Sequence, residues 1–290
     1  MKNAFQRVAL IGKYKSPEIA PHLLRLATYL RERGVEVFVD TDSASMLDHR
    51  GIEALTLKDL GVRADLAVVI GGDGTMLNIA RTLAPYGVAL VGVNQGRLGF
   101  LTDLSIHNML DSIGAMLDGQ FITEARMLLQ ADLRRDKIEL YDEAAFNDVA
   151  VSKGTDGALM EIEVRIDGLF VYRLRSDGLI IASPTGSTAY ALSSGGPIVH
   201  PGLEALTLVP VSPHTLSNRP IVVSAASIVE VHIQKALNAR SHFDAHSYME
   251  LVEGDVLTVR RCRHDVRLLH PVGHNYYHTL REKLHWSEAL

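Results

Sequence analysis

The sequence predicts a Rossmann-like α/β domain with a mostly parallel sheet, followed by a mostly-β domain. Three observations lead to this prediction. Continuous apolar runs alternate with helical patterns over residues 1–120, whereas the apolar residues after Gly119 recur with a period of two. The length of 290 residues suits about two domains, at roughly 150 residues each. Strands that alternate with helices are typical of a doubly wound parallel sheet.

The first domain, residues 1–120, contains apolar runs without polar alternation, as expected for strands that are buried on both faces of a sheet. These strands are predicted at 8–11, 35–39, 66–70 and 88–93. Helical patterns follow three of them, at 16–34, 76–83 and 105–117. Ser16 and Pro17 offer an N-cap and a first-turn proline for the first helix, and Gly34 can end it.

The second domain, residues 121–270, is predicted to be mostly β. Residues 161–174 alternate apolar and charged side chains around Asp167-Gly168, which is a strong hairpin signal. Further strands are predicted at 206–211, 220–223, 228–233 and 256–260. The pattern is helical again from Asn275, so residues 271–290 are predicted to form a helical tail that packs back on the first domain.

Composition and charge argue against several classes of protein. The chain has 29 Lys and Arg against 34 Asp and Glu, a net charge of −5, which argues against a general nucleic-acid binder. No apolar run approaches the roughly 20 residues that cross a bilayer, and the run near the N-terminus is too short for a signal peptide, so no membrane partner is expected. Cys262 is the only cysteine, which favours a reducing, cytoplasmic compartment.

A glycine-rich turn after the strand at 66–70 is the strongest sign of chemistry. It reads Gly71-Gly72-Asp73-Gly74-Thr75 and leads directly into a helix. Glycines let the backbone approach a ligand closely, and the amides at a helix N-terminus attract phosphate. A carboxylate repels phosphate, and three roles are open to Asp73. It could bridge to phosphate through Mg²⁺, take a proton from an attacking hydroxyl, or cap the helix.

Two further segments are candidates for ligand contact. Residues 94–101 form a second glycine-rich turn after the next strand, at the same predicted sheet edge, although a tight structural turn explains them equally well. Residues 176–197 combine a buried strand with small hydroxyl residues, glycines and Tyr190, which suits a nucleoside; a polar surface loop is the alternative. The P-loop pattern and the G-x-S-x-G elbow are absent, as is G-x-G-x-x-G after the first strand.

Four segments together resemble bacterial NAD kinases. They are GGDGTML at 71–77, NQGRLGFL at 94–101, Asn147-Asp148, and DGLIIASPTGSTAYALSSGGP at 177–197. The resemblance covers nearly the whole chain and implies the two-domain architecture of that family. It also implies transfer of the γ-phosphoryl group of ATP to the 2′-hydroxyl of the adenosine ribose of NAD⁺. Mg²⁺ would arrive with ATP, and the chain would form a homodimer or homotetramer.

The resemblance implies roles for individual residues. Asp73 is the general base, and Gly74 lies close to the ribose. Asn147 and Asp148 contact the adenosine part, with the carboxylate on ribose hydroxyls, and Asp177 reaches the nicotinamide end. ATP phosphates lie against Gly71, Gly72, Gly74 and Thr75. The adenosine-binding wall consists of Thr185, Thr188, Ala189, Tyr190, Ala191, Leu192 and Ser193.

Several charged and imidazole side chains stay open to interpretation. Arg175 either holds a phosphate, as in Gram-negative relatives, or is a solvated strand residue. His246 stands where many relatives carry Gln, and a neutral histidine can still donate one hydrogen bond. The histidine pairs 242/246 and 274/278 lack the glutamate of H-E-x-x-H and nearby cysteines, so no metal site built from side chains is predicted.

Two other functions compete with the NAD kinase interpretation. A non-catalytic NAD(P)-binding sensor would keep the nucleoside pocket, but binding alone gains little from a carboxylate beside phosphates. A lipid or sugar kinase could share the GGDG turn alone. The wall at 185–190 argues against such a kinase, and the chain also lacks the apolar patch expected of a lipid-facing enzyme.

Overall fold

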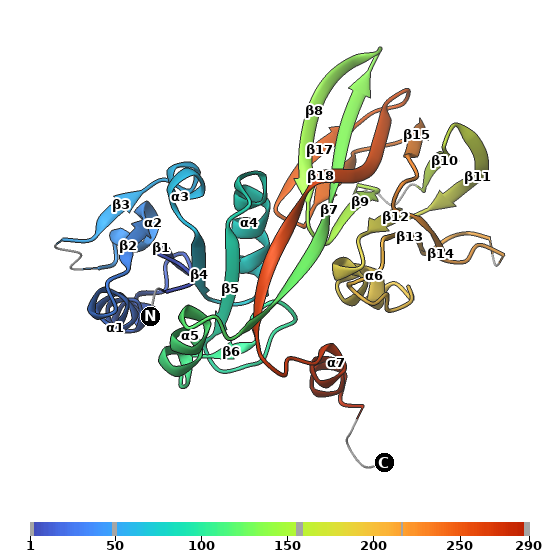
Figure 1. Cartoon of the computed structure of the whole chain (residues 1–290). Helices are drawn as coiled ribbons and strands as arrows, with labels where there is room; N and C mark the ends of the chain where they lie inside the picture. Colours follow the sequence, from blue (N-terminus) through green and yellow to red (C-terminus); the bar gives the residue numbers. More distant parts are fainter. Residues whose placement is uncertain (1–2, 48–50, 155–158, 216, 287–290) are drawn as a thin grey trace. The chain divides into compact units, whose positions relative to one another are not determined.

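The computed structural model describes residues 3–47, 51–154, 159–215 and 217–286. The chain forms two compact units, shown in Figure 1. The first comprises Met1–Ala125 together with Val266–Leu290, and the second comprises Arg126–Asp265. An α/β unit with a mostly parallel sheet and a mostly-β unit confirm the predicted fold class. Among the described residues, no helix is long and apolar enough to cross a membrane.

The first unit is built on a parallel sheet. Its strands are β1 (Arg7–Gly12), β2 (Glu36–Asp40), β3 (Glu53–Leu55), β4 (Leu66–Ile70) and β5 (Ala89–Asn94), in the order β5-β4-β1-β2-β3. The short strand β6 (Leu104–Ser105) pairs with β5, as do residues 267–268 of β18 (Val256–Pro271). Every residue of β4 and β5 is buried, as predicted from their unbroken apolar runs.

Helices connect these strands or, in the case of α7, follow the last strand of the chain. They are η1 (Pro17–Ile19), α1 (Ala20–Glu32), α2 (Thr41–Ala44), α3 (Leu57–Arg63), α4 (Asp73–Leu83), η2 (Ala84–Tyr86), α5 (Met109–Leu117) and α7 (Tyr276–Leu284). The prediction that Ser16 caps the first helix is wrong, because its side chain makes no capping hydrogen bond and a 3₁₀ turn precedes α1. Helix α5 begins at Met109 rather than at Ser105, because Ser105 pairs with β5.

The second unit contains two groups of antiparallel strands. One sheet has the order β14-β13-β12-β9-β16-β17. Its strands are β9 (Asp148–Ser152), β12 (Gly178–Ala182), β13 (Ala205–Val211), β14 (Ile221–Ser224), β16 (Ala239–Phe243) and β17 (Ser247–Leu251). The other group contains β7 (Phe121–Arg135), β8 (Ile138–Ala145), β10 (Met160–Ile166), β11 (Leu169–Ser176), β15 (Val229–Lys235) and the first half of β18. Side chains from both groups form one apolar core.

The predicted hairpin in this unit is confirmed. Strands β10 and β11 pair antiparallel from Met160–Ser176 to Ile166–Leu169, and Asp167 and Gly168 both adopt positive φ in the turn. The strand predicted at 256–260 is instead the first part of the much longer β18. The segment after β12 is not a loose surface loop, because it forms η3 (Thr185–Thr188) and α6 (Tyr190–Ser193), and its first three residues are buried.

Candidate functional site

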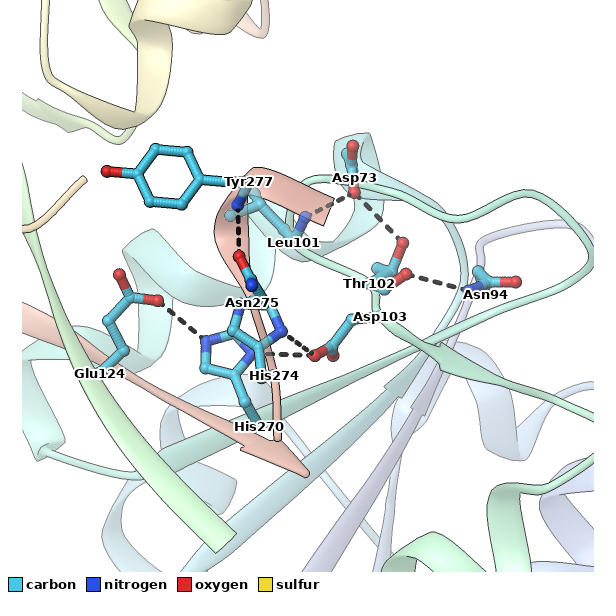
Figure 2. Close-up of polar contacts among 10 residues, drawn as sticks. All are labelled: Asp73, Asn94, Leu101, Thr102, Asp103, Glu124, His270, His274, Asn275 and Tyr277. Atoms are coloured by element: carbon cyan, nitrogen blue, oxygen red, sulfur yellow. Dashed lines mark hydrogen bonds and ion pairs between the residues drawn. The ribbon is translucent and has the colours of Figure 1, made fainter. Parts of the chain in front are cut away.

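The carboxylate of Asp73 faces the loop that follows β5. Helix α4 begins at Asp73, but its N-cap is Gly72 and no side chain caps it, so a capping role for Asp73 is excluded. Oδ2 of Asp73 accepts the backbone N–H of Phe100 at 2.9 Å. Oδ1 accepts the backbone N–H of Leu101 at 3.0 Å and the hydroxyl of Thr102 at 3.1 Å. Figure 2 shows the contacts with Leu101 and Thr102.

Glycine makes this close approach possible. A Cβ atom on Gly99 would lie 2.1 Å from Oδ1 of Asp73 and 2.2 Å from Oγ1 of Thr102, and one on Gly92 would lie 2.3 Å from the carbonyl oxygen of Leu101. The Asn94 amide anchors the loop by donating to the carbonyl of Thr102 at 3.0 Å. The second glycine-rich turn therefore holds the first one in place.

The glycines of the first turn differ in their surroundings. A Cβ atom on Gly71 would lie 2.8 Å from Oγ1 of Thr75, so the two residues pack against each other. Apart from the adjacent residues and the backbone of α4 itself, no atom lies within 4 Å of the Cβ position of Gly72 or Gly74. Their backbone is therefore open on that side, beside the N-terminus of α4, where a phosphate is favoured.

The second unit contains a cavity of about 380 Å³. Its lining residues are Asn147, Asp148, Ala150, Ser152, Ala189, Tyr190, His242, Asp244 and Ala245. Four of these residues, Asn147, Asp148, Ala189 and Tyr190, are sequence-predicted site residues. The other five were missed. Ala150 and Ser152 could have been found from the period of two along β9, which places them on one face with Asp148.

Two acidic residues determine the charge of this cavity. Asp244 accepts the backbone N–H groups of Phe146, Asn147 and Asp148, at 2.8, 2.6 and 3.1 Å. Burial, and then the negative charge of Asp244, raise the pKa of the Asp148 carboxyl to about 7. Burial, and then the charge of Arg240, lower the pKa of His242, whose Nε2 lies 3.1 Å from Oγ of Ser152.

The remaining predicted contact residues lie outside the lining of this cavity. Thr185 is buried and accepts from Arg126 at 3.3 Å, while the hydroxyls of Thr188 and Ser193 donate to backbone carbonyls within their own turns. Ala191 packs in a small buried cluster, and Leu192 lies in α6. These residues shape the two short helices rather than face the cavity.

Of three further predicted site residues, two form ion pairs and the third lies in a turn. Arg175 is exposed and pairs with Glu161 at 3.2 Å, and Asp177 pairs with Lys153 at 2.7 Å. His246 is exposed in the turn after β16, where its backbone N–H donates to the carbonyl of Phe243 at 2.9 Å.

Among the described residues, one group of side chains could hold a metal ion: Asp103, His270 and His274 of the first unit. Within the described residues, this group includes His274 but not His278, and the pair His242 and His246 belongs to no such group. Burial acts to raise the pKa of the Asp103 carboxyl, but hydrogen bonds to His270 and His274 outweigh it and lower the pKa to about 2.

The chain is similar to known proteins over nearly its whole length. Residues 8–121 match the family model for the ATP-NAD kinase N-terminal domain, and residues 146–271 match that for the ATP-NAD kinase C-terminal domain. An NAD kinase of Nitrosospira multiformis is 56% identical and covers 99% of this chain and 98% of the relative. An NAD kinase of Chromobacterium violaceum is 50% identical over 100% of both chains.

Two solved structures share the fold. Yeast NADH kinase complexed with NADH superposes with a TM-score of 0.90 at 25% identity, covering 99% of this chain and 90% of that one. An NAD kinase from Archaeoglobus fulgidus in complex with ATP gives a TM-score of 0.74 at 26% identity, covering 95% of this chain and 99% of that one.

Proposed function

The chain belongs to the ATP-NAD kinase family and is therefore an NAD kinase, and we propose that Asp73 is the general base of its reaction. One observation carries this proposal. Three donors from residues 100–102 fix the Asp73 carboxylate, which has about four lone-pair positions for hydrogen bonds. One acceptor position therefore remains for a substrate hydroxyl.

In the proposed step, the 2′-hydroxyl oxygen of the adenosine ribose of NAD⁺ forms a bond to the γ-phosphorus of ATP. The bond from that phosphorus to the β–γ bridging oxygen breaks, and ADP leaves. Asp73 receives the hydroxyl proton. Because the backbone of Phe100 and Leu101 already orients the carboxylate, little reorganisation is needed when the proton moves.

The glycine-rich turn at the N-terminus of α4 supports the proposed binding of phosphate. The open backbone at Gly72 and Gly74 and the helix N-terminus favour the charged groups of ATP. Mg²⁺ bound to these phosphates would neutralise part of their negative charge.

The cavity of the second unit supports the proposed recognition of adenosine. Its volume of about 380 Å³ lies within the range of small-molecule sites, and it combines the acidic Asp148 with the ring of Tyr190. We propose that Asp148 accepts hydrogen bonds from ribose hydroxyls and that Tyr190 lies against the base. Asn147 presents its side-chain amide to the same ligand.

The general-base role is tested by Asp73→Asn in an assay with ATP, Mg²⁺ and NAD⁺, with NADP⁺ measured by an NADP-specific dehydrogenase. We expect kcat to fall by about 10²–10⁴-fold while NAD⁺ still binds in calorimetry. Thr102→Val is the matched control, because it removes one donor to Asp73 but keeps the carboxylate. Its kcat should fall far less.

The same assay separates the enzyme from the sensor. If the unaltered protein binds NAD⁺ but makes no NADP⁺, the sensor interpretation is correct. Near-normal turnover of Asp73→Asn would instead remove Asp73 from the chemistry and leave the family assignment intact.

We further propose a cytoplasmic homodimer or homotetramer. The single cysteine supports a reducing compartment. Leu169, Phe170 and Val171 expose apolar side chains in succession on β11, which supports self-association through this strand. Phe170→Glu should lower the molecular mass measured by light scattering, and an unchanged mass would exclude β11 from the interface.

A further inference from the structure

A compact group of one carboxylate and two imidazole side chains lies in the first unit. Oδ2 of Asp103 lies 2.9 Å from Nδ1 of His270 and 3.0 Å from Nδ1 of His274. The two imidazole rings stack, with centroids 3.9 Å apart and an interplanar angle of 18°. Figure 2 shows both rings turned toward this one carboxylate. Asp103 follows the loop that holds Asp73, whereas both histidines come from the C-terminal part of the chain.

The second ring nitrogen of His270 has its own acidic partner. Nε2 of His270 lies 3.0 Å from Oε2 of Glu124. Metal-bound histidines almost always donate the other ring N–H to a carboxylate or carbonyl, which fixes the tautomer and the ring orientation. If Nε2 carries the proton for Glu124, then Nδ1 presents a lone pair to the space beside Asp103.

In that tautomer a positive charge is required in the space beside Asp103, because an imidazole lone pair and a carboxylate oxygen repel each other at 2.9 Å. A proton on Nδ1 would supply it and make His270 an imidazolium whose side chain is almost fully buried. A single divalent cation would instead satisfy the carboxylate and both Nδ1 atoms while leaving both rings neutral.

We propose that Asp103, His270 and His274 bind one divalent transition-metal ion of the zinc type through Oδ2 and the two Nδ1 atoms. Zinc takes nitrogen and carboxylate ligands at about 2.0–2.2 Å, so neighbouring ligand atoms of a tetrahedral site lie about 3.3 Å apart. The two separations of 2.9 and 3.0 Å are close to this value. Because the lone pair of an imidazole nitrogen lies in the ring plane, the stacked rings must also rotate apart before both Nδ1 atoms point at one ion. Imidazole ligands favour zinc-type ions over Mg²⁺.

The site also has access to solvent. A cavity of about 560 Å³ is lined by both Asp103 and His274, and by His278 one turn further along the chain. An ion can therefore enter from this cavity and keep a water molecule as its fourth ligand. The ion would connect Asp103, which follows Thr102, to two histidines of the C-terminal segment. We therefore assign the ion a structural role and not a role in phosphoryl transfer.

The experiment uses tag-free full-length protein, stripped with EDTA, dialysed, and titrated with Zn²⁺ in competition with a chromophoric chelator. We expect one Zn²⁺ per chain. Removal of a ligand in His274→Gln should weaken binding by more than about 100-fold, whereas loss of the outer carboxylate in Glu124→Gln should weaken it by about 10–100-fold. His278→Gln is the matched control, since His278 lines the same cavity but lies outside the three-ligand group.

A second measurement does not depend on the variants being stable. Co²⁺ added to the stripped, unaltered protein should give visible absorption bands typical of nitrogen ligation, and Zn²⁺ should remove them. Absence of these bands together with absence of stoichiometric Zn²⁺ binding would show a hydrogen-bonded cluster only and overturn the proposal. Zn²⁺ binding that survives His274→Gln unchanged would also overturn it, because the ion would then lie elsewhere.

Discussion

Oδ1 of Asp244 accepts a hydrogen bond from the backbone N–H of Asp148 at 3.1 Å, so the backbone of one acidic residue stabilises the charge of another in the same cavity. Asp244 has three backbone donors that stabilise its charge, whereas Asp148 is buried, and burial has the largest effect on its pKa. Burial and the charge of Asp244 therefore raise the pKa of Asp148 to about 7. This asymmetry has consequences for stability and for substrate binding.

We predict that Asp148 makes the folded protein less stable as pH rises. In the folded chain its pKa is about 7, whereas the reference value is 3.8. Between these values the folded state holds a proton that the unfolded state has lost, so the free energy of unfolding falls as pH rises from about 4 to about 7 and then levels off. A shift of about three units corresponds to at most about 4 kcal/mol. Urea unfolding across this range measures the slope.

Asp148→Asn supplies the control for this slope, because asparagine cannot titrate. The difference in unfolding free energy between the variant and the unaltered protein should grow in favour of the variant as pH rises through the same window. Parallel pH profiles for the two proteins would show that Asp148 ionises normally in the folded chain.

Asp244 is predicted to hold the edge of the cavity together. Asp244→Ala leaves the N–H groups of Phe146, Asn147 and Asp148 without their acceptor, at a cost of about 2–4 kcal/mol in unfolding free energy. Asp244→Asn keeps one acceptor oxygen and should cost less. Chemical denaturation of both variants gives the ranking, and equal stability of the two would contradict it.

The strands with unbroken apolar runs and the alternating hairpin strands β10 and β11 could be predicted from the sequence, whereas β3 and β8 could not. Strand β4 is buried along its whole length, so only apolar residues fit it. Strand β3 exposes Glu53 and Ala54, and half of the residues of β8 are exposed, so neither strand carries a clear hydrophobic pattern. These strands form through backbone hydrogen bonds to their neighbours β2 and β7, and such bonds do not depend on the side chains that a sequence pattern records.

For the candidate site too, the contacts could not be predicted from the sequence. The motif around Asp73 indicated a role for its carboxylate, but the partners that orient it are backbone N–H groups of Phe100 and Leu101, and every residue except proline has such a group. The contact between Asp103 and His270 joins residues 167 positions apart, beyond the reach of any local spacing rule.

Two glycine substitutions should distinguish a loss of activity caused by displacing the Asp73 carboxylate from one caused by blocking the ligand. Gly99→Ala places a methyl group 2.1 Å from Oδ1 of Asp73, so we expect a loss of about 1–3 kcal/mol in stability and a large fall in kcat. Gly74→Ala meets no protein atom and should raise helix stability by up to about 1 kcal/mol. Its turnover should nevertheless fall, because the methyl group occupies the side open to ligand. Thermal unfolding and steady-state kinetics measure both effects, and full activity of Gly74→Ala would place the ligand elsewhere.

Tyr190 offers the cleanest test of the adenosine cavity, because the residue is 46% exposed and is therefore expected to contribute little to the stability of the fold. Stacking of a base on an aromatic ring is worth about 1–3 kcal/mol, so Tyr190→Ala should raise KM for NAD⁺ by about 5- to 150-fold. Tyr190→Phe keeps the ring and should leave KM within about threefold, since only the hydroxyl is lost. Thermal unfolding should be nearly unchanged in both variants. A comparable rise in KM for the two would mean that the hydroxyl binds the substrate, whereas no rise in either would place the base away from Tyr190.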